Sequence, residues 1–473
     1  MKVEQLFTGC LAEMAYYIES NGEAVIIDPL RETDPYIRMA EADKAKIKYI
    51  FLTHFHADFV SGQYDLAQKT GATIVFGPGA EAEYELYNGK DGEDFIVGDI
   101  KIRLLHTPGH TMESSSYLLI DKDGNTPYLF SGDALFIGDV GRPDLAVKQG
   151  TLTERDLAGY LFDSLRNKIM PLPDDTIVYP NHGAGSACGK NMSSETFDTL
   201  GNQKKTNYAL RADMTKEEFI VEVTTGLKTP PQYFPNNVRM NKSINTSIDE
   251  VIHKGSTPID AATFKEMSDQ KDILVVDTRS KETYTEEGTV PGAWYIGLDG
   301  NFAPWVGALI KDIDQKIIFI AEDETRVHEI AIRFSRVGYD NTLGYLFGGI
   351  KNWIDHGFNV DKIGSMSGHE FAERLKDGSM EKALDVRKES EYLSEHVIDV
   401  ENFPLDFIHS NFAEIDSEKE YFLHCATGYR SLIAASIFKA NGVKNVTDVR
   451  GGFEDIKESK APISDYVCPT TLL

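Results

Sequence analysis

Short apolar runs alternate with polar turns along the first half of the chain. Residues 23–28 (EAVIID) and 48–53 (KYIFLT) are nearly continuous apolar runs, a pattern typical of buried strands that end in turns. Further strands are predicted at 72–77, 100–106, 115–120 and 128–133, and a helix at 152–169. This order predicts stacked sheets flanked by helices, with functional side chains on the loops that follow the strands.

A segment rich in proline and asparagine, residues 228–247, interrupts this periodicity and is the predicted domain boundary. Beyond it one unit occurs twice: a strand, an acidic helix, a second strand, a loop, a helix and a Gly-Gly turn. Three matched pairs lie 103 to 108 residues apart: Asp277 and Asp385, Arg326 and Arg430, Gly348 and Gly451. The repeat predicts two small α/β domains with mostly parallel sheets.

Composition narrows the classes of function. A chain of 473 residues with 41% hydrophobic and 26% charged residues is expected to fold throughout into several domains. Its net charge of -27 disfavours binding to nucleic acid or to anionic membranes. The four cysteines form no CxxC pair, and no run is apolar enough for a membrane span or a signal peptide. We therefore expect a soluble cytoplasmic protein with reduced thiols.

Histidines and aspartates cluster where the predicted strands end. His54, His56 and Asp58 lie in THFHADF, and three more candidates follow: His110 in HTPGHT, Asp133 in FSGD and His182 in YPNHGAGSACGK. Imidazole nitrogen with carboxylate oxygen suits iron, zinc or manganese, and a set of two histidines and one carboxylate leaves positions open for substrate. Any one of these histidines alone would be assigned to an ordinary turn; the ordered set predicts a metal site.

These residues resemble the metallo-β-lactamase superfamily over about residues 1–240, and the resemblance implies an αββα sandwich. One departure matters, because Phe59 stands where binuclear members carry a histidine that binds the second metal. A phenyl ring cannot ligate a cation, so a mononuclear site is favoured over a binuclear hydrolase. The alternative is a packing substitution that leaves a weak second site.

The segments around His56, Asp133 and His182 resemble the persulfide dioxygenase branch, specifically its fusions with rhodanese domains. That resemblance implies one Fe(II) held by His54, His110 and Asp133, with His56, Asp58 and His182 around these ligands. It implies oxidation of a persulfide sulfur by O2 towards sulfite, with no organic cofactor.

Three further residues near this site are candidates. Arg142 in the GRPD turn is predicted to clamp an anionic group of a thiol substrate, with a turn-stabilising salt bridge as the alternative. Lys190 lies close enough in sequence to Cys188 to lower the pKa of that thiol. By resemblance, Cys188 accepts or relays a persulfide near the metal; the alternative is a small buried cysteine.

A second reactive loop, LHCATGYRS (residues 423–431), lies between an apolar strand and a helix. A helix N-terminus, backbone N–H groups and Arg430 all favour the thiolate of Cys425, and Gly428 and Ser431 complete the loop as substrate contacts. Four residues separate Cys425 from Arg430, one fewer than in related phosphatases, which favours sulfur over phosphate. A structural cysteine is the alternative.

The loop, the DVR segment and the RGGF turn resemble the rhodanese family, whose cysteine carries sulfane sulfur. In the first copy Ala321 occupies the position of Cys425 and EDET replaces the small loop, so that copy lacks a nucleophile and is expected to be a spacer or docking domain. The predicted domains are 1–240 (metal), 248–362 (inactive rhodanese-like) and 365–473 (active rhodanese).

Together these features predict a persulfide dioxygenase coupled to sulfur transfer. The partners expected are a low-molecular-weight thiol persulfide, O2, and sulfite or thiosulfate; sulfur flow in the reverse direction uses the same residues. Two alternatives stay open: a zinc thioesterase of glyoxalase type, and a sulfur carrier or sensor with a structural metal. By analogy with enzymes of this type we expect a homo-oligomer, a dimer or a tetramer.

Overall fold

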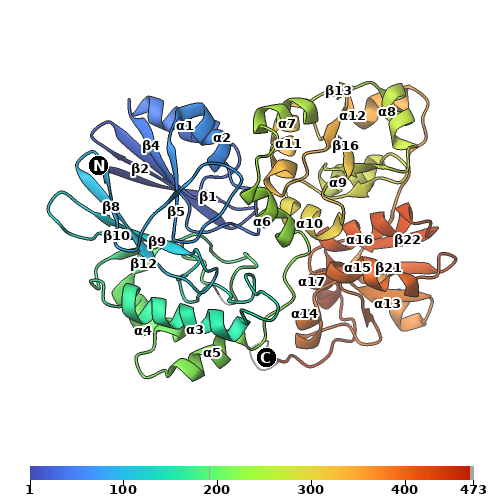
Figure 1. Ribbon diagram of the computed structural model, residues 1–473. Helices are drawn as coiled ribbons and strands as arrows, with labels where there is room; N and C mark the ends of the chain where they lie inside the picture. Colours follow the sequence, from blue (N-terminus) through green and yellow to red (C-terminus); the bar gives the residue numbers. More distant parts are fainter. Residues whose placement is uncertain (191, 469–473) are drawn as a thin grey trace. The chain divides into compact units, whose positions relative to one another are not determined.

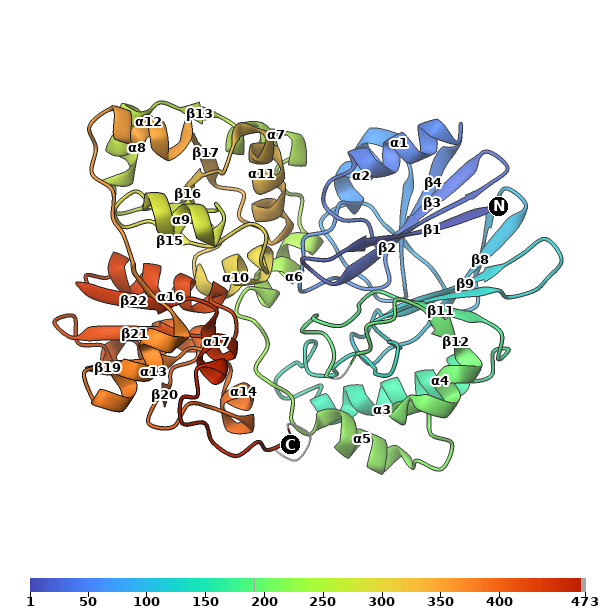
Figure 2. The same ribbon diagram turned by 180° about the vertical axis from the view of Figure 1, so that it is seen from behind.

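The computed structural model describes residues 1–190 and 192–468, so residues 469–473 of the third predicted domain lie outside the described part. The chain divides into two compact units. The first consists of Met1–Ile248 with Ser335–Gly338, and the second of Asp249–Phe334 with Tyr339–Leu473. Figures 1 and 2 show the elements of both units from opposite sides.

The first unit contains two six-stranded sheets. One has the order β1 (Lys2–Thr8), β2 (Glu13–Ser20), β3 (Glu23–Ile27), β4 (Lys46–Phe51), β5 (Thr73–Phe76) and β6 (Tyr87–Asn88). The other has the order β12 (Asp198–Thr199), β11 (Ile177–Pro180), β10 (Tyr128–Gly132), β9 (Ser115–Ile120), β8 (Ile100–His106) and β7 (Asp94–Val97). Strands β3 to β6 run parallel, as do β10 and β11, so that the loops after β3, β4, β10 and β11 can carry the site.

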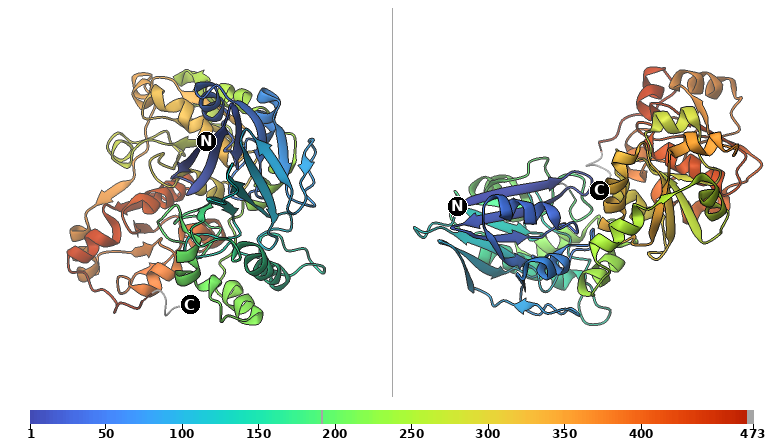
Figure 3. Two further views of the ribbon diagram at one scale, coloured as in Figure 1. Left: turned by 90° about the vertical axis from the view of Figure 1, so that its left-hand side faces the viewer. Right: turned by 90° about the horizontal axis from the view of Figure 1, so that it is seen from above.

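Helices cover the outer faces of this pair of sheets. The helices are α1 (Asp34–Ala42), α2 (Gln63–Thr70), α3 (Glu154–Ser164), α4 (Leu200–Thr206) and α5 (Lys216–Thr224). Figure 1 shows α1 and α2 on one side and α3, α4 and α5 on the other, and Figure 3 shows the same layers from two further directions. Between the sheets, buried side chains such as Tyr16, Phe51, Tyr117 and Phe130 form one apolar core. This is the αββα sandwich that the sequence predicted.

The predicted helix at 152–169 is present as α3, which continues through a π-helical turn at Leu165–Ile169. The predicted boundary segment, residues 228–247, precedes the end of the first stretch of the first unit at Ile248, and it contains α6 (Phe234–Lys242). Pro235 lies in the first turn of α6, where the missing N–H group costs no intrahelical hydrogen bond. The proline is therefore compatible with a helix inside the segment that interrupts the periodicity.

The second unit contains two five-stranded sheets whose strands pair in parallel. The first has the order β13 (Pro258–Ile259), β17 (Thr342–Leu346), β16 (Lys316–Ile320), β14 (Ile273–Asp277) and β15 (Trp294–Tyr295). The second has the order β18 (Gly364–Met366), β22 (Asn445–Val449), β21 (Glu420–His424), β19 (Lys382–Asp385) and β20 (Glu401–Asn402). Each copy thus places its first strand at one edge, followed by its fifth, fourth, second and third. The identical topology confirms the repeat found in the sequence.

The helices of the second unit alternate with these strands along the chain. They are α7 (Ile248–Gly255), α8 (Ala261–Ser268), α9 (Lys281–Glu287), α10 (Phe302–Leu309), α11 (Val327–Arg336), α12 (Gly349–Asp355), α13 (Gly368–Asp377), α14 (Glu389–Ser394), α15 (Ile408–Asn411), α16 (Tyr429–Ala440) and α17 (Gly452–Glu458). Within the described residues, every helix is too short or too polar to cross a membrane.

Candidate functional site

Three side chains from different loops of the sandwich converge on one point. His54 follows β4, His110 lies between β8 and β9, and Asp133 follows β10. The Nε2 atoms of His54 and His110 lie 3.9 and 3.4 Å from Oδ2 of Asp133, and all three side chains are buried. The structure thus brings together the three residues predicted as metal ligands.

Neighbouring groups fix the orientation of both imidazoles. Nδ1 of His54 lies 2.9 Å from the Thr53 hydroxyl, and Nδ1 of His110 lies 2.9 Å from the main-chain carbonyl of Arg142. A carbonyl only accepts, so Nδ1 of His110 carries the proton and its Nε2 lone pair faces Asp133. Outer partners of this kind set the tautomer of metal-binding histidines.

The charge balance of this cluster fits a cation. Burial, followed by the fields of His56, His110 and His182, lowers the pKa of His54 well below its ordinary value, so its imidazole is neutral and able to ligate. Both carboxylate oxygens of Asp133 are buried without a hydrogen-bond partner. A buried carboxylate without a partner is costly unless a cation or a proton compensates it. The donor set therefore fits a divalent metal ion.

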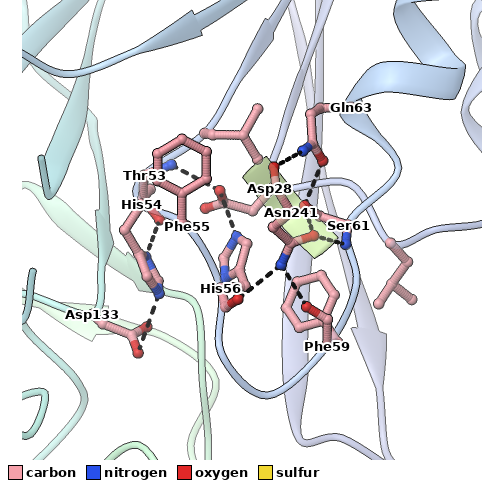
Figure 4. A network of polar contacts seen from close by, with 12 residues as sticks. Asp28, Thr53, His54, Phe55, His56, Phe59, Ser61, Gln63, Asp133 and Asn241 are labelled. Atoms are coloured by element: carbon pink, nitrogen blue, oxygen red, sulfur yellow. Dashed lines mark hydrogen bonds and ion pairs between the residues drawn. The ribbon is translucent and has the colours of Figure 1, made fainter. Parts of the chain in front are cut away.

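His56 lies beside this cluster and is held by Asp28, which follows β3. Its Nε2 lies 3.0 Å from Oδ1 of Asp28 (Figure 4). Burial would lower the pKa of His56, but the carboxylate of Asp28 outweighs it and the net shift is upward. The side chain of Phe59 stacks against the imidazole of His56, with 4.4 Å between ring centroids. The preference for one metal over a weak second site stays a prediction.

Asn241, which sequence reasoning missed, closes the histidine loop from helix α6. Its side-chain amide donates 2.8 Å hydrogen bonds to the carbonyls of His56 and Phe59, and its Oδ1 accepts from the backbone N–H of Ser61 (Figure 4). Asn241 lies 185 residues from His56 in the chain, so no local pattern could have indicated this contact.

A second group of potential ligands lies next to the first: Asp58, His182 and Cys188. Nε2 of His182 is 3.5 Å from Asp58 and 3.6 Å from Oδ1 of Asp133. Burial, then the carboxylates of Asp58 and Asp133, raise the pKa of the Cys188 thiol well above its ordinary value. The sequence placed Cys188 near the metal by resemblance, and in the structure its sulfur lies within 4.8 Å of ligand atoms of Asp58 and His182.

The expectation that Lys190 lowers the pKa of Cys188 is wrong. The ammonium group of Lys190 donates to the main-chain carbonyls of Glu222 and Thr225, at the end of α5. Lys190 therefore interacts with the end of a helix. The carboxylates near Cys188 raise the pKa of its thiol, which is the opposite of the expected effect.

The side chain of Arg142 is buried in its own turn. Nε and Nη2 form a bidentate pair with Asp144 at 2.6 and 2.7 Å, and the guanidinium also donates to the carbonyls of Ala187 and Lys228. With only 6% of its side chain exposed, the planar fork has no free edge for a substrate. The geometry matches the turn-stabilising alternative, and the contribution of Arg142 to the metal site is its carbonyl on His110.

In the second unit, Cys425 lies between β21 and α16. Its Sγ accepts a 3.2 Å hydrogen bond from the N–H of Gly428, and the Ser431 hydroxyl lies 3.5 Å away. The Gly-Gly turn packs under this loop, since the N–H of Phe453 donates to the Cys425 carbonyl at 2.6 Å. A Cβ atom on Gly452 would lie 2.5 Å from that carbonyl oxygen, so the turn requires glycine. The loop thus places one N–H group and one hydroxyl on the sulfur of Cys425, and binding of a sulfur anion there stays a prediction.

Arg430 binds a carboxylate in this structure. Its two terminal nitrogens donate to Glu391 of α14 at 2.6 and 2.8 Å. Glu391 was not singled out in the sequence. A direct role for Arg430 in holding the terminal sulfur of a persulfide stays a prediction, and it requires Glu391 to share the guanidinium.

The corresponding loop of the first copy carries no thiol. Ala321 follows β16 at the position of Cys425 and is buried. The carboxylate of Glu322 accepts from Ser280 and Thr283, and Arg326 pairs with Asp299 and Glu329. The charged side chains of this loop are thus paired with groups of the same copy around a small pocket, and the loop offers no nucleophile for sulfur transfer.

Comparison with known proteins agrees with this geometry. Residues 8–182 match the metallo-beta-lactamase superfamily model, and residues 260–356 and 367–459 match the rhodanese-like domain. The probable hydroxyacylglutathione hydrolase glo2 of Schizosaccharomyces pombe is 31% identical over 199 residues, which cover 41% of this chain and 72% of that protein. The chain belongs to the metallo-beta-lactamase superfamily. It carries tandem rhodanese domains after the superfamily domain.

Two further known proteins are similar. The cytoplasmic hydroxyacylglutathione hydrolase of Arabidopsis thaliana is 33% identical over 37% of this chain, and the match spans 65% of that relative's length, just under two thirds. The crystal structure of a metallo-beta-lactamase from Staphylococcus aureus subsp. aureus COL is 32% identical, with a TM-score of 0.63. The match covers 73% of this chain and 98% of that one, so it extends beyond the metal domain.

Proposed function

We propose that the protein is a non-heme iron persulfide dioxygenase whose product is passed to a rhodanese domain. The observation that carries the proposal is the set of His54, His110 and Asp133, with Phe59 stacked on the neighbouring His56, in a chain that also carries the Cys425 loop. Two imidazoles and one carboxylate are typical of mononuclear iron sites with open positions. Fe(II), one per chain, would supply dioxygen activation and binding of the persulfide sulfur there.

Neighbouring residues hold the proposed metal ligands in place. Thr53 and the Arg142 carbonyl hold the two imidazoles in place, and Phe59 contributes a hydrocarbon surface where a binuclear enzyme needs a ligand. Cys188 lies beside the cluster, and by resemblance it would accept or return a sulfane sulfur, which requires its thiol, whose pKa is raised, to lose a proton. The burial of these groups limits access of water to the reacting sulfur.

The proposed chemistry balances in two steps. A low-molecular-weight thiol persulfide, O2 and water give the thiol, sulfite and protons, so sulfane sulfur is oxidised and dioxygen is reduced. A second persulfide transfers its sulfane sulfur to Cys425, and sulfite attacks that sulfur to give thiosulfate and restore the thiolate. The net role would be sulfide detoxification in the cytoplasm, and the reverse direction of sulfur flow uses the same cysteine.

The deciding experiment measures O2 uptake by protein loaded with Fe(II) and given glutathione persulfide. Sulfite and thiosulfate are quantified for wild type, Cys425→Ala and the matched control Cys10→Ala. We expect persulfide-dependent uptake in all three proteins, with thiosulfate replaced by sulfite only in Cys425→Ala. Absence of uptake with persulfide would overturn the dioxygenase proposal, and thiosulfate formation by Cys425→Ala would overturn the coupling.

A zinc-dependent thioesterase of glyoxalase II type, fused to a sulfurtransferase, is the second candidate. It is favoured by the two relatives named as hydroxyacylglutathione hydrolases. It is disfavoured by Phe59, which stands where the resemblance implies a ligand for a second metal. Zinc in the purified protein together with hydrolysis of S-lactoylglutathione would support it, whereas iron with O2 uptake would exclude it.

A further inference from the structure

Within the second unit, the copy without a nucleophile packs against the start of α16, directly after the Cys425 loop. The hydroxyl of Tyr429 donates to the carbonyl of Gly297 at 2.8 Å, and the N–H of Tyr295 donates to Ser436 at 2.8 Å. A Cβ atom on Gly300 would lie 2.2 Å from the Tyr429 ring. These close contacts hold residues 297–300 of the first copy in a fixed position beside the Cys425 loop.

One cation of the first copy reaches the loop itself. Lys281 begins α9, and its Nζ donates to the carbonyl of Thr427 at 3.4 Å, two residues after Cys425. Burial raises the pKa of Asp448, behind the loop, to about 7, while Ser431, Lys281 and Arg450 act against this rise. The ammonium group of Lys281 is thus close enough to the loop to influence a buried carboxyl there.

Two guanidinium groups at and near the loop are already paired with carboxylates. Arg430 forms its bidentate pair with Glu391, and Arg387 pairs with Asp385 at 2.6 Å. For Lys281 the structure gives one carboxylate contact, an exposed 3.9 Å pair with Glu282, which contributes little. A chain with a net charge of -27 needs a local positive charge to admit an anionic substrate.

We propose that the copy without a nucleophile completes the sulfur-transfer site of the other copy, by placing Lys281 where it attracts small sulfur oxyanions to Cys425. The ligand class is a sulfite or thiosulfate anion. The proposal rests on the proposed sulfur-transfer function and assigns a role to the first copy beyond that of a spacer. Lys281 is a positioning residue for the anion, and Cys425 remains the nucleophile.

The first test does not depend on turnover. Alkylation of Cys425 is followed by peptide mass spectrometry with iodoacetate, an anion, and with iodoacetamide, its neutral analogue. The ratio of the two rates cancels any change in thiol pKa and reports the local charge. We expect Lys281→Ala to lower the ratio about three- to fivefold, Lys281→Glu to lower it further and Lys281→Arg to retain it.

Lys271→Ala is the matched control, because Lys271 is an exposed lysine of the same copy at the opposite end of β14. An unchanged ratio in Lys281→Ala and Lys281→Glu would overturn the proposal, even in a protein that transfers sulfur. The second test measures thiosulfate sulfurtransferase kinetics, where Lys281→Ala is expected to raise KM for thiosulfate with kcat retained. A lack of turnover in wild type would count against the proposed function, while the alkylation ratio still decides the role of Lys281.

Discussion

The ring of Phe59 stacks on the imidazole of His56, with 28° between the planes, at the position where the resemblance implies a ligand for a second metal. Both side chains are fully buried. The identity of residue 59 therefore decides between a hydrocarbon wall and a second metal site, which makes it the most informative position for mutagenesis.

We predict that Phe59→His raises the metal content from about one towards two ions per chain. The new imidazole would join Asp58, His182 and Cys188, which already lie within ligand distance of one another. Metal content is measured by elemental analysis after dialysis, with Phe59→Leu as the control that keeps an apolar side chain. Two ions per chain in wild type would contradict the mononuclear assignment and indicate that Cys188 replaces the missing histidine.

A second prediction concerns Thr53, whose hydroxyl lies 2.9 Å from Nδ1 of His54. Thr53→Val keeps the shape of the side chain and removes the hydrogen bond, so the imidazole loses its fixed orientation. We expect metal affinity to fall about 10- to 100-fold, the usual effect of losing such a partner. Competition with a chelator measures the affinity, and Thr53→Ser should retain it. Equal affinity in Thr53→Val would show that packing alone orients His54.

The principal chemical groups could be predicted from the sequence because each follows a strong apolar strand. His54, Asp133 and Cys425 come directly after such runs, where strand ends place side chains at one edge of a sheet. The repeat could also be predicted, because both copies have the same order of strands and helices and the same Gly-Gly turn. Features that depend on local patterns were therefore predicted from the sequence.

The missed or misassigned groups depend on contacts between distant segments or on competing partners. Asn241 reaches the histidine loop from a segment that looked like a linker. Glu391 occupies Arg430, and Asp144, two residues after Arg142, occupies that guanidinium. The sequence shows which kinds of group a charged side chain can bind, but it does not show which partner in the folded chain it binds.

The Gly-Gly turn gives a third prediction. Gly452 has φ of +63° and approaches the Cys425 carbonyl, whereas Gly442 has φ of +90° with open space around its Cβ position. Gly442→Ala is expected to cost only backbone strain, about 1–2 kcal/mol, while Gly452→Ala adds a steric clash and costs more than about 3 kcal/mol. Urea unfolding monitors stability, and sulfurtransferase activity should fall only in Gly452→Ala. Similar losses for both variants would show that the turn can move away from the loop.

The last prediction follows from Asp448, which is buried behind the Cys425 loop with one oxygen lacking a hydrogen-bond partner. Burial raises its pKa from 3.8 to about 7. Between pH 4 and 7 the folded protein therefore binds more protons at this position than the unfolded chain does, so the free energy of unfolding falls as pH rises across this window and levels off above about pH 7. Above that pH the buried charge lowers the free energy of unfolding by about 4 kcal/mol.

Asp448→Asn removes the charge and keeps a polar partner for Ser431. We expect it to stabilise the second unit at pH 8 and to have little or the opposite effect at pH 4, because the native carboxyl is then protonated and neutral. Urea midpoints of wild type and variant at the two pH values measure the difference, in which all other titrating groups cancel. An equal effect at both pH values would mean that Asp448 does not titrate in this window, and that its value to the loop lies in packing alone.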